Sequence, residues 1–117
     1  MTTDAEWNNL TPQEQDAVVT KALWPNASEC RSKRQGRGLE VAGLARTWPG
    51  FGLVVEAMGK KGWHFVLWSE EDGWWAAWEK RSVPNVSDVN DPRAEANLPS
   101  APSATALAAV RALEAKP

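Results

Sequence analysis

The sequence predicts an α+β fold, a three-layer α/β/α sandwich in which a small antiparallel three-stranded sheet carries helices on both faces. The stretch Trp63–Lys80 holds five of the eight tryptophans and is typical of two short strands, because large apolar residues recur on both parities. A sheet with apolar groups on both sides needs a cover on both sides. We therefore expect helices, a second subunit or a ligand against each face.

The two strands are expected to join at an acidic turn with Asp72-Gly73 as its central pair. This turn places Leu67 opposite Trp78 and Trp68 opposite Ala77. Side chains alternate across a strand, so a loop longer by one residue would mix the two faces. In the expected register one face carries Trp63, Phe65, Leu67, Trp74, Ala76 and Trp78, and the other carries His64, Val66, Trp68, Trp75 and Ala77.

Residues 1–9 are expected to form a polar N-terminal tail, and residues 10–117 a single domain. The first helix of this domain should begin at Thr11. Thr11 and Glu14 form a capping box, and proline is favoured at the first helical position that follows. The helix should end before Pro25, because the residue before a proline avoids helical geometry.

A second helix, which we expect to be the main helix of the core, lies between residues 39 and 62. Residues 93–98 (RAEANL) alternate with period two and predict a third strand. An alanine-rich helix should follow, capped by Ser103 and ending near Ala115. The apolar stripe of the second helix consists of Trp48, Phe51, Val55 and Met58.

The composition is typical of a globular protein and argues against several kinds of ligand and site. With 43% hydrophobic and 24% charged residues, the 117-residue chain has an ordinary globular composition. A net charge of −2 gives no reason to expect a nucleic-acid polymer as ligand. The one cysteine, Cys30, excludes an internal disulfide and a multi-cysteine metal site. No signal peptide or membrane-spanning stretch is recognisable, so a cytoplasmic location is expected.

Trp48–Gly62 has the pattern W-x-x-x-x-L-V-V-E-x-M-x-x-x-G, and the tryptophan-rich hairpin, the alternating strand and the alanine-rich helix follow it. In this order of parts, over about residues 10–115, the chain resembles the phage ABA-sandwich domain family of small bacteriophage proteins. The basic segment 26–38 departs from that pattern as a longer insertion, and the last helix lacks the family's Thr-Pro start and cysteine. The resemblance implies an α/β/α sandwich and a phage or prophage origin, hence the cytoplasm of an infected bacterium.

Few residues are suited to catalysis, since the chain has one histidine, one cysteine and no tyrosine. His64 lies between Trp63 and Phe65 on a strand, where a packed or rim position is expected rather than a catalytic one. The carboxylates of Glu70, Glu71 and Asp72 lack the spacing of a calcium loop. We therefore predict no enzymatic activity, no cofactor and no metal site.

The tryptophans suggest a ligand site, because eight in 117 residues exceed what a core of this size needs. Trp68 and Trp75 are the candidates, with His64 beside them. Indole rings stack on nucleobases for about 1–3 kcal/mol per base. Phosphates would be held by Arg31, Lys33, Arg34 and Arg37 of the basic segment. The predicted function is non-catalytic sequestration of a phosphate-bearing nucleotide, such as a host immune signal.

Two alternatives stay open at the level of sequence. The basic segment can be a solvated loop without a ligand, and Trp68 and Trp75 can be covered by a helix or a second subunit. The same tryptophans and arginines can also bind a host protein or a second copy of the chain, since both residue types are enriched in interface hot spots. A homo-oligomer is expected, and a nucleic-acid polymer is the least favoured partner.

Overall fold

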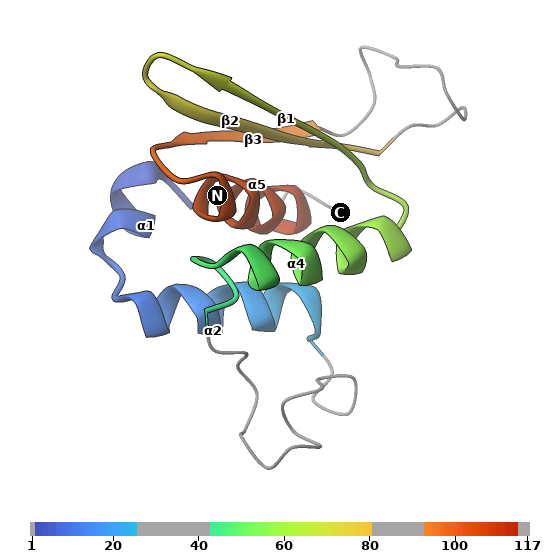
Figure 1. Cartoon of the computed structure of the whole chain (residues 1–117). Helices are drawn as coiled ribbons and strands as arrows, with labels where there is room; N and C mark the ends of the chain where they lie inside the picture. Colours follow the sequence, from blue (N-terminus) through green and yellow to red (C-terminus); the bar gives the residue numbers. More distant parts are fainter. Residues whose placement is uncertain (1, 26–42, 81–92, 115–117) are drawn as a thin grey trace.

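The computed structural model of the protein describes residues 2–25, 43–80 and 93–114. The strands form one antiparallel sheet of order β1-β2-β3, so the predicted α+β class with a small three-stranded sheet is confirmed. Figure 1 shows this sheet on one side of α5 and helix α2 on the other. The elements are α1 (Asp4–Asn9), α2 (Pro12–Leu23), α4 (Trp48–Lys60), β1 (His64–Glu70), β2 (Gly73–Glu79), β3 (Arg93–Leu98) and α5 (Ala101–Glu114).

All the described helices lie on one face of the sheet (Figure 1). Helix α5 packs against β2 and β3, and α4 packs against β1. The second helical layer of the predicted sandwich is not seen in the part of the chain that the structure describes. The face under the helices, here called the inner face, carries Phe65, Leu67, Trp74, Ala76, Trp78, Ala94, Ala96 and Leu98. The opposite face, here called the open face, carries His64, Val66, Trp68, Trp75, Ala77, Glu79, Arg93, Glu95 and Asn97.

Helix α5, and not the predicted α4, is the central helix of the core. It contacts β2 and β3 on one side and α2 and α4 on the other, and most of its residues are buried. Its many alanines allow this, because small side chains let a helix approach several neighbours closely. The helix also begins at Ala101, before the expected cap at Ser103.

Helix α4 buries only part of the predicted stripe. Its buried residues are Gly50, Val54, Ala57 and Met58, so Met58 is buried as predicted. Phe51 and Val55 are half-buried, whereas Trp48 is 60% exposed. A Cβ atom at Gly50 would lie 2.4 Å from the carbonyl oxygen of Gly43, so this side of the helix must face the preceding turn. Trp48 is about 200° away from Gly50 around the helix and therefore points outward.

The β1–β2 turn consists of Glu71-Asp72, one position before the predicted pair. In consequence Leu67 pairs with Ala76 and Trp68 with Trp75, two positions along β2 from the predicted partners. A shift by an even number leaves each side chain on the same side of the sheet. The predicted division of the hairpin into two faces is therefore confirmed, although the predicted pairing is wrong.

Gly73 explains the position of the turn. Its φ is +134°, and a Cβ atom there would lie 2.7 Å from the carbonyl oxygen of Leu98. The glycine is therefore the first residue of β2, where the backbone of β3 comes close, and not the second residue of the turn. Only glycine combines this φ with such a close neighbour.

The expected N-terminal tail contains helix α1 instead. The hydroxyl of Thr3 accepts the backbone N–H of Glu6 at 3.1 Å, and the Glu6 carboxylate accepts the backbone N–H of Thr3 at 3.0 Å. Trp7 is then buried, 1% exposed, in the hydrophobic core. The same capping box stands at the start of α2, whose predicted beginning and end are confirmed. Strand β3 is also confirmed, with its apolar residues on the inner face.

Candidate functional site

Three of the predicted site residues lie together on the open face. His64 and Trp68 project from β1, and Trp75 projects from β2 directly opposite Trp68. His64 is exposed, as expected for a rim position. The predicted phosphate-binding residues Arg31, Lys33, Arg34 and Arg37, together with Cys30, lie outside the described residues. Their proximity to the tryptophans stays a prediction.

Trp68 and Trp75 form a stacked cross-strand pair. Their ring centroids are 5.9 Å apart, and their planes differ by 4°. Aromatic surfaces in contact are separated by roughly 3.5 Å, so a base inserted between two indoles requires about 7 Å. The pair is therefore too close to admit a base between its rings. A planar ligand has to stack on an outward ring surface, which makes this pair a platform rather than a slot.

The two indole N–H groups are in different situations. Trp68 Nε1 donates to Glu70 Oε1 at 2.8 Å, and this bond orients the ring. Trp75 Nε1 is buried and has no acceptor among the described residues. An unpaired buried donor costs about 1–3 kcal/mol. A phenylalanine would avoid this cost, so the stability of the described fold does not by itself account for a tryptophan at position 75.

Charged groups lie at both ends of the tryptophan pair. The turn end carries three carboxylates in residues 70–72. At the other end, Arg93 forms ion pairs with Glu79 at 3.1 Å and with Glu95 at 3.5 Å. These carboxylates already balance the charge of Arg93. The described part of the open face therefore presents an apolar centre with a charged rim, and no unpaired arginine that faces a phosphate.

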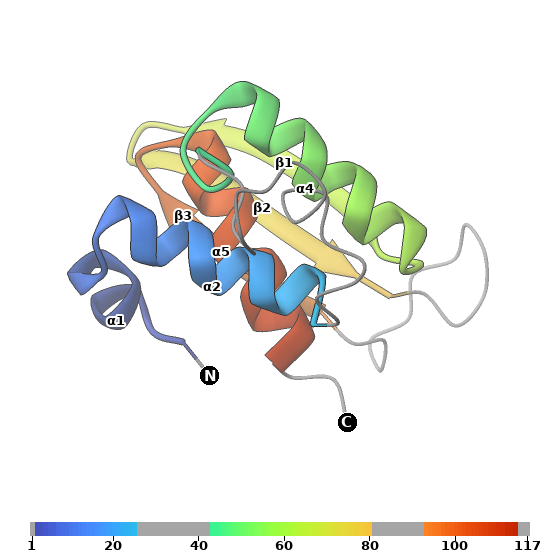
Figure 2. The same ribbon diagram turned by 90° about the horizontal axis from the view of Figure 1, so that it is seen from below.

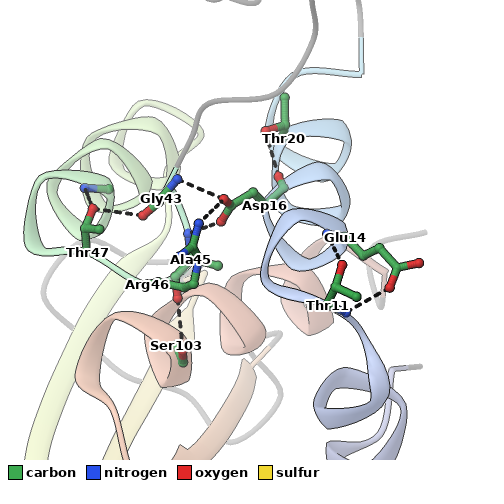
Figure 3. A network of polar contacts seen from close by, with 10 residues as sticks. Thr11, Glu14, Asp16, Thr20, Gly43, Ala45, Arg46, Thr47 and Ser103 are labelled. Carbon is green, nitrogen blue, oxygen red and sulfur yellow. Dashed lines mark hydrogen bonds and ion pairs between the residues drawn. The ribbon is translucent and has the colours of Figure 1, made fainter.

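A buried carboxylate on α2 is a second place where chemistry would be suspected, because buried acids often act in catalysis. Asp16 is 1% exposed. Figure 3 shows that its oxygens accept the backbone N–H groups of Gly43 at 2.8 Å and Ala45 at 2.9 Å, and Nη2 of Arg46 at 3.3 Å. All three donors belong to the turn before α4, so Asp16 holds this turn against α2.

The sequence of α2 contains a signal for this buried carboxylate, which does not belong to the predicted site. The buried residues of α2 are Asp16, Val19, Thr20 and Leu23, which follow the three- and four-residue steps of a buried stripe. An acid at the first position of such a stripe requires buried donors. The sequence spacing shows the need for donors, but it does not show that they come from residues 43–46.

Arg111 is a third candidate, here for binding an anion. A depression of about 280 Å³ beside it is lined by Arg93, Ala94, Glu95 and Arg111. Each nitrogen of its guanidinium donates one hydrogen bond: Nε to Thr2 O at 2.8 Å, Nη1 to Glu95 O at 2.9 Å, and Nη2 to Asp4 Oδ1 at 2.6 Å. Arg111 therefore clamps the N-terminal residues and β3 to α5, and the Asp4 carboxylate already balances its charge.

Within the ranges 2–25, 43–80 and 93–114, no three His, Cys, Asp or Glu side chains are grouped so that they could hold a metal ion. None of the helices in these ranges is long and apolar enough to cross a membrane. Comparison with protein-family models, with curated proteins and with solved structures finds no match. The likeness to the phage ABA-sandwich domain family therefore stays a prediction from the sequence, and so does the phage origin.

Proposed function

We propose that this protein is a non-enzymatic binding protein that uses the open face of its sheet, centred on Trp68 and Trp75, to contact another protein. The observation that carries this proposal is the stacked indole pair on a sheet face that no described helix covers. Tryptophan is among the residues that contribute most to binding energy at the centres of protein interfaces. A protein ligand would also supply the second covering layer that the predicted three-layer sandwich requires.

The arrangement of polarity on this face favours a protein partner. Protein interfaces combine an apolar centre with a polar rim. Here Val66, which is 44% exposed, extends the apolar centre along β1 beside Trp68. The carboxylates of residues 70–72 and the ion pairs of Arg93 form the rim. A partner with basic groups opposite residues 70–72 would complement this charge pattern and associate faster at low salt.

A second candidate function is the sequestration of a phosphate-bearing nucleotide. The nearly parallel rings of Trp68 and Trp75 favour it, because a base can stack on their outward surfaces. The phosphates would then depend on Arg31, Lys33, Arg34 and Arg37, since Arg93 is already paired. In a phage setting such a ligand would be a host immune signal, and binding it without turnover would deprive its receptor.

Two parallel experiments test these functions. A pull-down from bacterial extract, followed by calorimetry with the purified partner, should give a complex that the double variant Trp68→Ala/Trp75→Ala loses. The matched control is Trp48→Ala, which removes an exposed tryptophan from α4 and should leave binding intact. If the purified partner binds the double variant as tightly as the wild type, the open face is not the binding surface.

The nucleotide arm uses thermal melts with cyclic dinucleotides and ADP-ribose derivatives. A ligand that binds only the folded state stabilises it by RT ln(1 + [L]/Kd), so the melting temperature rises with the ligand concentration. The increase should disappear in Trp75→Ala and in a variant with alanine at positions 31, 33, 34 and 37. A shift that both variants retain contradicts nucleotide stacking on this face.

A further inference from the structure

We propose that two copies of this protein pair through the outer edge of strand β1, so that two three-stranded sheets join into one continuous antiparallel sheet across a two-fold axis. This inference concerns the edge of the sheet and does not depend on what binds the open face. Four observations support it. The backbone groups of β1 point toward the free edge, and this edge lacks the polar cover that the edge of β3 has. The side chains at the two ends of β1, His64 and Glu70, complement each other, and exposed apolar side chains lie nearby.

The outer edge of β1 presents unpaired backbone groups. The order β1-β2-β3 leaves this edge without a partner among the described strands. Glu70 and Gly73 flank the two-residue turn and therefore form a hydrogen-bonded pair. Hydrogen-bonded and non-hydrogen-bonded pairs alternate along an antiparallel ladder. The N–H and C=O groups of Phe65, Leu67 and Ser69 consequently point away from β2, toward the free edge.

The same alternation can be checked at the opposite edge of the sheet. Counted across β2, it directs the carbonyl group of Glu95 outward from β3. There Arg111 Nη1 donates to Glu95 O at 2.9 Å, which agrees with this direction. Arg111, which also binds Thr2 and Asp4, thus occupies part of the edge of β3. The exposed side chains of Arg93 and Glu95 protect this edge further.

The edge of β1 lacks these protections. Its residues 65–68 (FVLW) are apolar, and the strand contains no lysine and no proline, two residue types that commonly prevent edge-to-edge pairing. Lysine, proline or an inward-pointing charge would interfere with a second strand, and β1 has none of them along its middle. An edge of this kind is suited to pairing with another strand.

Strand β1 is complementary to itself in the antiparallel direction. Leu67 is the middle residue of His64–Glu70, so a two-fold axis at Leu67 aligns the whole strand with its copy. Phe65 then faces the partner's Ser69, and outward-pointing backbone groups meet at each of these positions. At both ends of the ladder His64 faces the partner's Glu70. Cross-strand pairs that are oppositely charged or hydrogen-bonded stabilise a sheet.

Two of the three large apolar side chains that are highly exposed in the described ranges, Trp48 and Val66, lie on the β1 side of the sheet. The large apolar side chains with high exposure are Trp48 at 60%, Leu53 at 41% and Val66 at 44%. In the proposed register Val66 lies opposite the partner's Trp68, which buries it on the open face. Trp48 belongs to α4, which contacts β1 and runs along that side of the sheet (Figure 2). Leu53 is about 160° from Phe51 around the same helix and points away from β1. Trp48 therefore lies where the α4 helices of the two copies would approach each other.

Aromatic contacts connect these two parts of the edge within one copy. Trp48 packs edge-on against Phe51, with centroids 5.3 Å apart, and Phe51 packs against Phe65 at 5.8 Å. Phe65 in turn stacks on the buried Trp78 at 4.4 Å. The exposed Trp48 of α4 is therefore connected through Phe51 to Phe65 of β1, which lies two residues from the proposed two-fold axis. Dimerisation would bury both Trp48 and Phe65.

The oligomeric state tests the proposal. Sedimentation velocity across a concentration series should show a dimer for the wild type and a folded monomer for Val66→Lys. The matched controls are Glu71→Lys, a change of charge in the turn, and Trp75→Ala, which alters the open face away from the edge. Both should remain dimeric. A wild type that is monomeric at all concentrations overturns the proposal, and so does a dimer that Trp75→Ala breaks and Val66→Lys leaves intact.

The register is tested by a charge exchange. His64→Glu places two glutamates opposite each other at both ends of the ladder and should weaken dimerisation roughly tenfold. Adding Glu70→Lys in the same chain should restore the affinity. If the double variant stays as weak as the single one, a dyad at Leu67 is wrong.

Amide hydrogen exchange identifies the edge directly. In the dimer the amides of Phe65, Leu67 and Ser69 should be protected, and in the Val66→Lys monomer they should exchange rapidly. The amide of Trp68 points toward β2 and should be protected in both. Rapid exchange at Leu67 in a wild-type dimer would overturn the proposal. Protection at Leu67 that arises only when another protein is added to a monomer would assign the edge to a different chain and equally reject the second copy.

Discussion

Asp16 of α2 accepts the backbone N–H of Gly43 at 2.8 Å across 27 residues of sequence. The same carboxylate accepts the N–H of Ala45, so one buried side chain holds two backbone donors of the turn before α4 (Figure 3). Thr47 caps α4 from this turn, and Ser103 of α5 donates to the carbonyl oxygen of Ala45 at 2.9 Å. The position of α4 relative to α2 and α5 therefore depends on Asp16.

Asp16→Ala should lower the free energy of unfolding by about 3–5 kcal/mol, because it leaves two buried N–H groups without acceptors. Urea denaturation monitored by circular dichroism measures this change. The matched control is Glu56→Ala, which removes an exposed carboxylate paired with Lys60 at 3.1 Å and should change stability by less than about 0.5 kcal/mol. Equal effects of the two variants would contradict the structural role of Asp16.

Two glycines of α4 should respond in opposite ways to alanine. A Cβ atom at Gly50 would lie 2.4 Å from Gly43 O and 2.6 Å from Leu44 Cα, both of them backbone atoms that cannot move aside easily. Gly50→Ala should therefore destabilise the protein by at least about 2 kcal/mol. Gly52 has no atom within 4 Å of its Cβ position, so Gly52→Ala should stabilise the helix by about 0.5–1 kcal/mol. The melting temperatures of the two variants, compared with that of the wild type, test this prediction. A Gly50→Ala protein as stable as the wild type would show that α4 does not approach the turn this closely.

Substitution by phenylalanine should affect the stability of the protein differently at Trp75, a candidate binding residue, and at Trp78, a residue of the core. Trp78 Nε1 donates to Thr105 O at 3.2 Å inside the core, so Trp78→Phe should cost about 2–3 kcal/mol through the lost bond and the smaller ring. Trp75 Nε1 has no acceptor in the described ranges, and Trp75→Phe should be neutral or stabilising by up to about 1 kcal/mol. Denaturant midpoints measure both. A large destabilisation by Trp75→Phe would mean that this indole N–H has a partner.

The capping box at the start of α1 should open when the solution is made acidic. Hydrogen bonds from the backbone N–H and then from the side chain of Thr3 lower the pKa of Glu6 below its ordinary value. A carboxylate with a lowered pKa in the folded state stabilises that state above its unfolded pKa, and the contribution is lost as the pH falls through the folded value. The capping box of α1 should therefore open only below the ordinary pKa of a glutamate.

The amide chemical shift of Thr3, followed by NMR during an acid titration, measures this transition. Glu6→Gln keeps an oxygen acceptor without a titrating charge and should remove the transition. If the Thr3 amide titrates at the ordinary pKa of glutamate, or titrates unchanged in Glu6→Gln, the capping box is not its cause.

Several features of the fold are local and were predictable for that reason. The capping box and proline at the start of α2 define that helix within four residues, and the alternation in residues 93–98 defines β3. The two faces of the hairpin follow from side-chain parity, so they survive an error of two positions in the pairing. The grouping of Trp68 and Trp75 on one face is of this kind. The capping box of Thr3 and Glu6 is equally local, so the sequence around it also carries the signal for α1.

The remaining features depend on contacts between distant segments. The turn lies at Glu71-Asp72 because Gly73 is needed beside the carbonyl group of Leu98, which belongs to another strand. Asp16 finds its donors in a turn 27 residues later. The pairing of Arg93 with Glu79, which removes a cation from the candidate site, joins two strands.

The sequence by itself therefore determined most of the elements of this protein, with the exception of α1, and the side of the sheet on which each hairpin side chain lies. Periodicity and capping act over a few residues, so the chain carries that information locally. The tertiary structure alone decided that α5 is the central helix, that the described helices share one face of the sheet, and that β1 lies at an edge of the three described strands. Those outcomes depend on which surfaces pack together. The free energy of packing depends on how well two segments fit each other, and the sequence of one segment alone does not contain it.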